Sequence, residues 1–125
     1  MKQRELMICR YIKAYNHFDI DAMLADLDTR FTFENVSDGS IDMSLEGIPA
    51  FKEQAEKTAR CFKKRHQKVT SFMHYETHTE VDIAYCAVLA VDLPCGLRRG
   101  DELHVAGRSV FRFAEDKIAA ITDIS

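Results

Sequence analysis

The sequence predicts an α+β domain in which three helices from the N-terminal half pack on a curved, mixed or antiparallel β-sheet. Apolar residues repeat at helical spacing in three segments that all end before residue 63. Most of the chain after these segments alternates with the period of two that is typical of strands. Helices grouped ahead of long strands favour the α+β class, and helices packed into the hollow of a curved sheet form a cone.

The composition is that of one small globular domain. The chain has 125 residues, enough for a single core, with 46% apolar and 30% charged residues. The formal charge is −3 and no basic stripe follows any element, so nucleic-acid binding is not expected. No repeat, linker or low-complexity tract divides the chain, so we expect one domain over residues 1–125.

The cysteines do not form a recognisable metal or redox motif. They are scattered, with no Cys-x-x-Cys and no Cys–His spacing that fits zinc. Neither a signal peptide nor a long apolar run is found in the sequence, so we expect no export and no contact with a membrane. Reduced thiols in a cytoplasmic protein are the simplest interpretation, with two structural disulfides as the alternative.

Three helices are expected in the first half. The first covers Gln3–His17, and its apolar stripe at i, i+3, i+4 and i+7 consists of Ile8, Tyr11, Ile12 and Tyr15. Asp19 is a suitable N-cap for a short second helix over Ile20–Leu27. The third helix follows Gly47, with a proline in its first turn, where a missing N–H is tolerated. Its predicted buried stripe is Phe51, Ala55, Ala59 and Phe62.

Strands are expected between and after the helices. Phe31–Val36 alternates, so that Phe33 and Asn35 share one face. Ile41–Glu46 follows a turn and is expected at a sheet edge. The later strands are predicted over Gln67–Tyr75, Val81–Leu93, Glu102–Phe113 and Ile118–Ser125.

The strand predicted over Val81–Leu93 is apolar on both faces. An antiparallel sheet with one face in water does not show this pattern, so something must cover the second face. Ile118, Ala120 and Ile124 are expected to lie on the outer face of the last strand. Together these apolar residues predict a homodimer.

Asp123 lies in an apolar row of the last strand. Alternation places it on one face with Ile121 and Ser125, and places Ser109 and Phe111 on one face of the preceding strand. A carboxylate in such a row must be paired, partly hydrated or shifted in pKa, because burying a bare charge is costly. Asp123 is therefore the candidate for proton transfer.

The order of elements resembles that of the NTF2-like superfamily, in its SnoaL-like and ketosteroid isomerase-like branches. The local marks of the resemblance are Arg10–Asp21, Gly47 before the third helix, and Val110–Phe113 late in the chain. The match runs from about Cys9 to the C-terminus. It implies a conical domain with a pocket, in a fold that hosts isomerases, dehydratases, cyclases, hydrolases and non-enzymes.

The resemblance also suggests roles for single residues. Tyr11 falls where ketosteroid isomerases carry the tyrosine of the oxyanion hole, Asn35 where they carry the aspartate base, and Ser109 where they carry a second, protonated aspartate. An amide cannot take a proton from carbon, so Asn35 argues against steroid isomerisation by that route. Asp123 falls where SnoaL-type polyketide cyclases carry an acid/base aspartate, and Ser109 replaces the histidine that assists it there.

The site is predicted from these positions. We expect Asp123 and Tyr11 to be catalytic, with Tyr11 donating to a developing oxyanion. The residues expected to bind or orient the ligand are Asn35, Ser109, Tyr15, Tyr85, Phe33 and Phe111. The alternative is a buried polar network that satisfies itself, with Tyr15 and Tyr85 as core residues.

No metal or cofactor is expected. His74, Glu76 and His78 alternate and offer metal ligands, but the segment is polar on both sides, so a solvated loop is the preferred interpretation. His104, Arg108 and Arg112 are expected on the face opposite Ser109, toward solvent or a partner.

The sequence thus predicts a SnoaL-like protein whose conical pocket takes a small, largely apolar molecule. Proton transfer by Asp123 would be of the isomerase, dehydratase or cyclase type. A non-catalytic ligand-binding or dimerisation domain of the same fold is the alternative.

Overall fold

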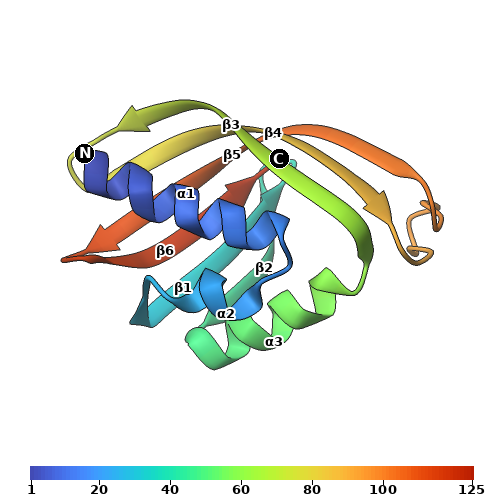
Figure 1. The fold of residues 1–125 in the computed structure, drawn as a ribbon, viewed down its shortest axis with the longest axis horizontal. Helices are drawn as coiled ribbons and strands as arrows, with labels where there is room; N and C mark the ends of the chain where they lie inside the picture. The colour runs from blue at the N-terminus through green and yellow to red at the C-terminus, as the bar shows by residue number, and fades with distance from the viewer.

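Three helices cover the concave face of one open, strongly curved sheet of six strands (Figure 1). The computed structural model describes residues 1–125. The helices are α1 (Lys2–Asn16), α2 (Ile20–Leu24) and α3 (Ile48–Ala59). The strands are β1 (Leu27–Ser37), β2 (Ser40–Glu46), β3 (Phe62–His74), β4 (His78–Leu89), β5 (Glu102–Ala114) and β6 (Lys117–Ile124). This architecture confirms the predicted α+β class.

The sheet is mixed because its last strand lies in the middle. The strand order is β2-β1-β6-β5-β4-β3, and every neighbouring pair is antiparallel except β1 with β6. The predicted edge strand Ile41–Glu46 is β2, which is indeed at one edge. The β1–β6 pairing joins the first and last strands of the chain, and it brings Asn35 opposite Asp123.

The core lies between α1 and the concave face of the sheet. Three residues of the predicted helical stripe are buried, with Ile8 fully enclosed and Tyr11 only 8% exposed, and Tyr15 is partly buried. The sheet contributes large apolar side chains from four strands, namely Phe31, Val81, Ile83, Phe111, Ile118 and Ile121. Burial of these apolar surfaces is the main force that holds the helices in the hollow of the sheet.

The N-terminal end of α1 is fixed to the turn between β3 and β4. The Arg4 guanidinium donates to the backbone carbonyls of Tyr75 at 2.6 Å and Glu76 at 2.7 Å. It also lies over the ring of Phe113, 5.1 Å from the centroid. These contacts set the position of the helix that carries Tyr11 and Tyr15.

Several element boundaries differ from those expected, and three of them change the assignment of a residue. The second helix ends at Leu24, because Leu27 already belongs to β1 and is paired in register with Ile118. Phe62 begins β3 instead of closing the third helix, and it pairs with Leu89. β4 ends at Leu89, where the backbone bonds to Gly100 and Asp101 and the chain leaves the sheet.

The expected position of Ile118 on the outer face is wrong. The register between β5 and β6 shifts, because Arg112 pairs with Ala120 whereas Phe113 pairs with Ile118. The extra residue in β6 is a β-bulge, which reverses the alternation of side chains at that point. Ile118 and Ile121 therefore both face the core, at 0% and 1% exposure, and Ile118 cannot contribute to an interface between subunits.

Candidate functional site

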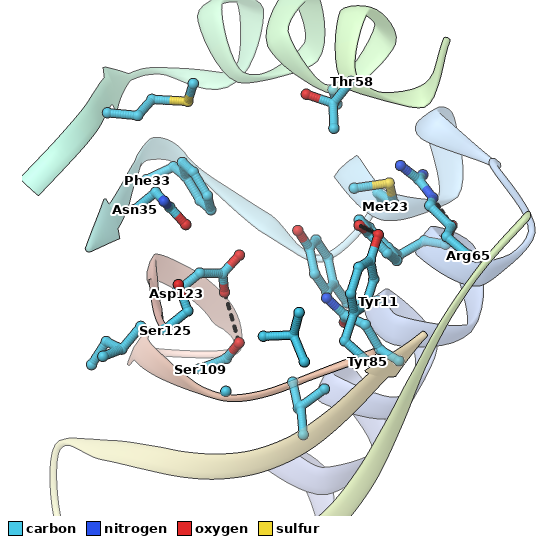
Figure 2. Close-up of a pocket in the computed structure, with 18 of the residues that line it drawn as sticks. Tyr11, Met23, Phe33, Asn35, Thr58, Arg65, Tyr85, Ser109, Asp123 and Ser125 are labelled. Carbon is cyan, nitrogen blue, oxygen red and sulfur yellow. Dashed lines mark hydrogen bonds between the residues drawn. The ribbon is translucent and has the colours of Figure 1, made fainter. Parts of the chain in front are cut away.

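The helices do not fill the hollow of the sheet, and a cavity of about 390 Å³ remains (Figure 2). All three helices and all six strands contribute to its 22 lining residues, 12 of which are hydrophobic. Its volume lies in the range of about 300–1,000 Å³ that is usual for small-molecule sites. A mostly apolar wall with a few polar groups suits an organic ligand more than a hydrated ion.

Asp123 and Ser109 form a cross-strand pair in the wall of this cavity. They are partners in the β5–β6 register, and Ser109 Oγ donates to Asp123 Oδ1 at 2.7 Å. Both side chains point inward, as alternation along the two strands predicted. This is the only hydrogen bond of the carboxylate, so Oδ2 is free toward the cavity.

The carboxylate of Asp123 titrates close to neutrality. Burial raises its pKa to about 6, and the bond from Ser109 opposes this rise only in part. No cationic side chain forms an ion pair with it that would restore an ordinary value. A group with such a pKa can both accept and release a proton under physiological conditions.

Tyr11 presents an unpaired hydroxyl to the same cavity. Its side chain makes no hydrogen bond within the chain and no bond to Asp123. Burial, and secondarily the charge of Asp123, raise the pKa of Tyr11 well above its usual value, so the phenol stays protonated. Its ring is held edge-on by Phe111, with centroids 5.8 Å apart. Tyr11 is therefore an oriented donor without an acceptor.

Asn35 of β1 lies beside Asp123 of β6, on the side of β6 away from Ser109. The register pairs Asn35 with Asp123, so a row of three polar side chains crosses β1, β6 and β5. The Asn35 amide nitrogen donates to Asp42 at 2.8 Å and to Ser37 at 3.3 Å. Because its donor is occupied, the amide offers its oxygen to the cavity.

A second polar group lies on the other side of the hollow. Figure 2 shows Tyr85 and Arg65 there, across from Asp123 and Asn35. The hydroxyls of Tyr15 and Tyr85 are 3.0 Å apart, and burial raises the pKa of each. The Arg65 guanidinium is stacked on the ring of Tyr15, with Cζ 3.7 Å from the centroid.

Sequence reasoning did not identify Arg65. The residue lies ahead of the strand expected over Gln67–Tyr75, yet it is only 5% exposed and lines the cavity. Arg65 points inward with Gln67 by regular alternation along β3, which begins at Phe62 and not at Gln67 as expected. Extending the alternation of β3 backward from Val69 would have indicated this orientation.

Seven of the eight candidate residues line the cavity, and Phe111 does not. Its side chain is 1% exposed in the core, where it supports the ring of Tyr11. Phe33 does line the cavity and packs on Phe51, with ring centroids 5.3 Å apart. Phe111 therefore positions Tyr11 and has no surface to offer a ligand.

The histidines considered as metal ligands form other contacts. His74 bonds to Thr79 at 2.9 Å and to Glu5 at 2.6 Å, while His78 lies 3.3 Å from Glu80. No group of three or more His, Cys, Asp or Glu side chains is arranged to hold a metal ion. None of the helices has the length and apolar content to cross a membrane.

A conical α+β domain with a cavity between its helices and its sheet has the NTF2-like architecture. Solved structures with NTF2-like, ketosteroid isomerase-like and cystatin-type folds share it. The chain belongs to the SnoaL-like domain family, whose model matches residues 8–121. No curated protein matches the chain in sequence.

Three solved structures illustrate the similarity. A candidate polyketide cyclase from Xanthomonas campestris pv. campestris has a TM-score of 0.84 and 17% identity, covering 99% of this chain and 90% of that chain. AclR, a candidate hydroxylase from Streptomyces galilaeus, has a TM-score of 0.78 and 15% identity, covering 98% and 88%. TerC, co-crystallised with polyporic acid, has a TM-score of 0.79 and 13% identity, covering 98% and 90%. At these identities the similarity establishes the fold alone.

Proposed function

We propose that the chain binds a small, largely apolar molecule in its cavity and transfers a proton through Asp123. The observation that carries the proposal is that one cavity contains two polar groups with unsatisfied hydrogen-bonding atoms. Asp123 has a pKa of about 6 and a free Oδ2, and Tyr11 has a hydroxyl without an acceptor. Perturbed titratable groups that converge in a cavity are typical of sites where protons move.

In the proposed reaction, Oδ2 of Asp123 accepts a proton from a carbon next to a carbonyl group of the ligand. The electron pair of the broken C–H bond moves onto the carbonyl oxygen, and the Tyr11 hydroxyl donates to the resulting enolate. Ser109 keeps Oδ1 occupied, so that Oδ2 is the reactive oxygen. The Asn35 oxygen would accept from a ligand hydroxyl and orient it.

The fate of the enolate decides the reaction class. Return of the proton to a different carbon gives isomerisation. Release of a neighbouring hydroxyl as water, with the proton from Asp123, gives dehydration. Attack of the enolate carbon on a second carbonyl gives cyclisation, with the proton delivered to the new alkoxide. The descriptions of structurally similar proteins, a candidate polyketide cyclase and a protein crystallised with polyporic acid, support a small organic ligand.

Hydrogen–deuterium exchange tests this chemistry without knowledge of the natural substrate. Small cyclic ketones such as 1-indanone are incubated with the protein in D₂O, and exchange beside the carbonyl is followed by NMR. We expect the wild-type protein to accelerate exchange by about 10²-fold or more, the lower range for positioned acid–base groups. Asp123→Asn abolishes the effect, whereas Asp116→Asn, a change in an exposed turn, preserves it.

The outcome also decides between the two candidate functions. If the wild-type protein binds ketones but does not exchange their protons, proton transfer is wrong and the cavity belongs to a non-catalytic binding domain. If Asp123→Asn exchanges as fast as the wild type, Asp123 is not the base.

We also propose that the outer face of the sheet joins two copies of the chain. Ala84 and Ala106 are exposed cross-strand partners there, and Cys86 on the same face of β4 is exposed as well. A two-fold axis through these small side chains would bury the same patch of each copy. Light scattering after size exclusion should give a dimer, and Ala106→Glu should give a monomer. A monomeric wild-type protein would contradict the proposal.

A further inference from the structure

The two sides of the cavity differ in hydrogen-bonding character. On the β1–β6–β5 side, Asn35 and Asp123 present acceptor oxygens. On the α1–β3–β4 side, Arg65 and the Tyr15–Tyr85 pair present donors (Figure 2). The cavity is therefore polarised, and a ligand that fits it must carry groups of opposite character at its two ends.

Arg65 is a buried cation without a counter-charge. It is 5% exposed, its Nε donates to the Tyr15 carbonyl at 2.8 Å, and its Nη2 has no hydrogen-bond partner. The rings of Tyr15 and Phe18 stack on the guanidinium, with Cζ 3.7 Å and 4.5 Å from their centroids. Stacking does not satisfy the N–H groups, which lie in the guanidinium plane, and guanidinium does not lose its proton.

The adjacent tyrosine hydroxyls also have a hydrogen to donate. Tyr15 and Tyr85 share one hydrogen bond of 3.0 Å, and neither hydroxyl donates to any other group of the chain. Two hydroxyls carry two hydrogens, and only one lies between them, so the other is free for an acceptor. Burial makes ionisation of either phenol unfavourable, so the pair cannot itself supply the charge that Arg65 lacks.

We propose that Arg65 and the Tyr15–Tyr85 pair bind an anionic oxygen of the ligand, of the carboxylate or phenolate type. The inference rests on the function proposed for the same cavity and adds the class of molecule: an organic acid with an apolar body. The anion cannot lie at the other end, because the carboxylate of Asp123 repels it. The acid group thereby orients the molecule and leaves its far end at Asp123 and Tyr11.

Matched acid and amide probes test the inference on the wild-type protein. Dissociation constants for benzoate, benzamide, 2-naphthoate and 2-naphthamide are measured by calorimetry at pH 8, where Asp123 is ionised. We expect each acid to bind about tenfold or more tightly than its amide, because charge-assisted hydrogen bonds are markedly stronger than neutral ones. Equal affinities for acid and amide would overturn the anion subsite.

Variants assign the preference to named residues. Arg65→Met should remove the preference for the acid, and Tyr85→Phe, a smaller change, should reduce it several-fold. Arg10→Met is the matched control, because Arg10 pairs with Asp26 outside the cavity and should leave the preference intact. If Arg65→Met does not fold, the wild-type comparison and Tyr85→Phe decide the question.

The two proposals fail in distinguishable ways. If the acids bind no more tightly than the amides but the protein exchanges protons on ketones, the anion subsite is wrong and the catalytic proposal stands. Acid binding that depends on Arg65, without any exchange, would support the subsite in a binding protein. Binding of neither acids nor amides would overturn the subsite.

Discussion

Ser109 donates a 2.7 Å hydrogen bond to one oxygen of Asp123, and the other oxygen of that carboxylate has no partner in the chain. This hydrogen bond holds the carboxylate in one orientation and leaves its second oxygen without a hydrogen-bond donor. The carboxylate is thereby positioned to act on a ligand, and its ionised form is poorly stabilised by the protein.

Ionisation of Asp123 should therefore destabilise the fold. Its pKa is about 6 in the folded chain and 3.8 in the unfolded chain, so the folded state retains the proton longer. The free energy of unfolding is unaffected by Asp123 below pH 4 and falls as the pH rises from 4 to 6. Above pH 6 it stays lower by at most about 3 kcal/mol. Asp123→Asn should be more stable than wild type at pH 8 and similar at pH 4. Chemical denaturation at both values measures this, and a variant destabilised at pH 8 would contradict it.

Removing the serine hydroxyl should raise the pKa of Asp123 further. The bond from Ser109 is the one contribution that lowers this pKa, so Ser109→Ala leaves burial unopposed. An NMR titration of the carboxyl carbon should show a midpoint above the wild-type value of about 6. Ser71→Ala is the matched control, because it removes a 2.9 Å bond to surface Asp82. An unchanged midpoint in Ser109→Ala would mean that the bond does not persist in solution.

Replacing Asn35 by aspartate should concentrate negative charge at one end of the cavity. Asn35 is paired in register with Asp123 and donates to Asp42, whose pKa it lowers. Asn35→Asp removes that donor and adds a like charge, so the pKa of both neighbouring carboxyls should rise. We expect a loss of stability at pH 8 that is recovered at pH 5, measured by thermal unfolding. A loss that is independent of pH would show that the charges do not interact.

Truncating Phe111 and Phe33 should have different consequences. Phe111 is enclosed in the core, so Phe111→Ala should cost about 3–5 kcal/mol. Phe33 is half-buried at the cavity wall, so Phe33→Ala should cost less and should mainly weaken binding of 2-naphthoate. Urea denaturation and calorimetry measure the two effects. Equal losses of stability would contradict the assignment of Phe111 to the core.

Local patterns predicted the helices and the inward orientation of Asp123 and Ser109, because helical spacing and strand alternation act over a few residues. They failed where the register shifts and where a strand begins earlier than expected. A bulge in β6 carried Ile118 into the core. Arg65 was not predicted because the expected strand began at Gln67, whereas β3 begins at Phe62. The contact between Asn35 and Asp123 depends on a parallel pairing of distant strands, which no short pattern encodes.

The central position of β6 has a consequence for the order of folding. β1 and β2 join the rest of the sheet only through this strand, which follows the other five in the chain. Before β6 is in place, β1 and β2 cannot dock on the rest of the sheet, and the cavity lacks the strand that carries Asp123. Until β6 has docked, β1 and β5 therefore expose unpaired edges to chaperones or to other chains.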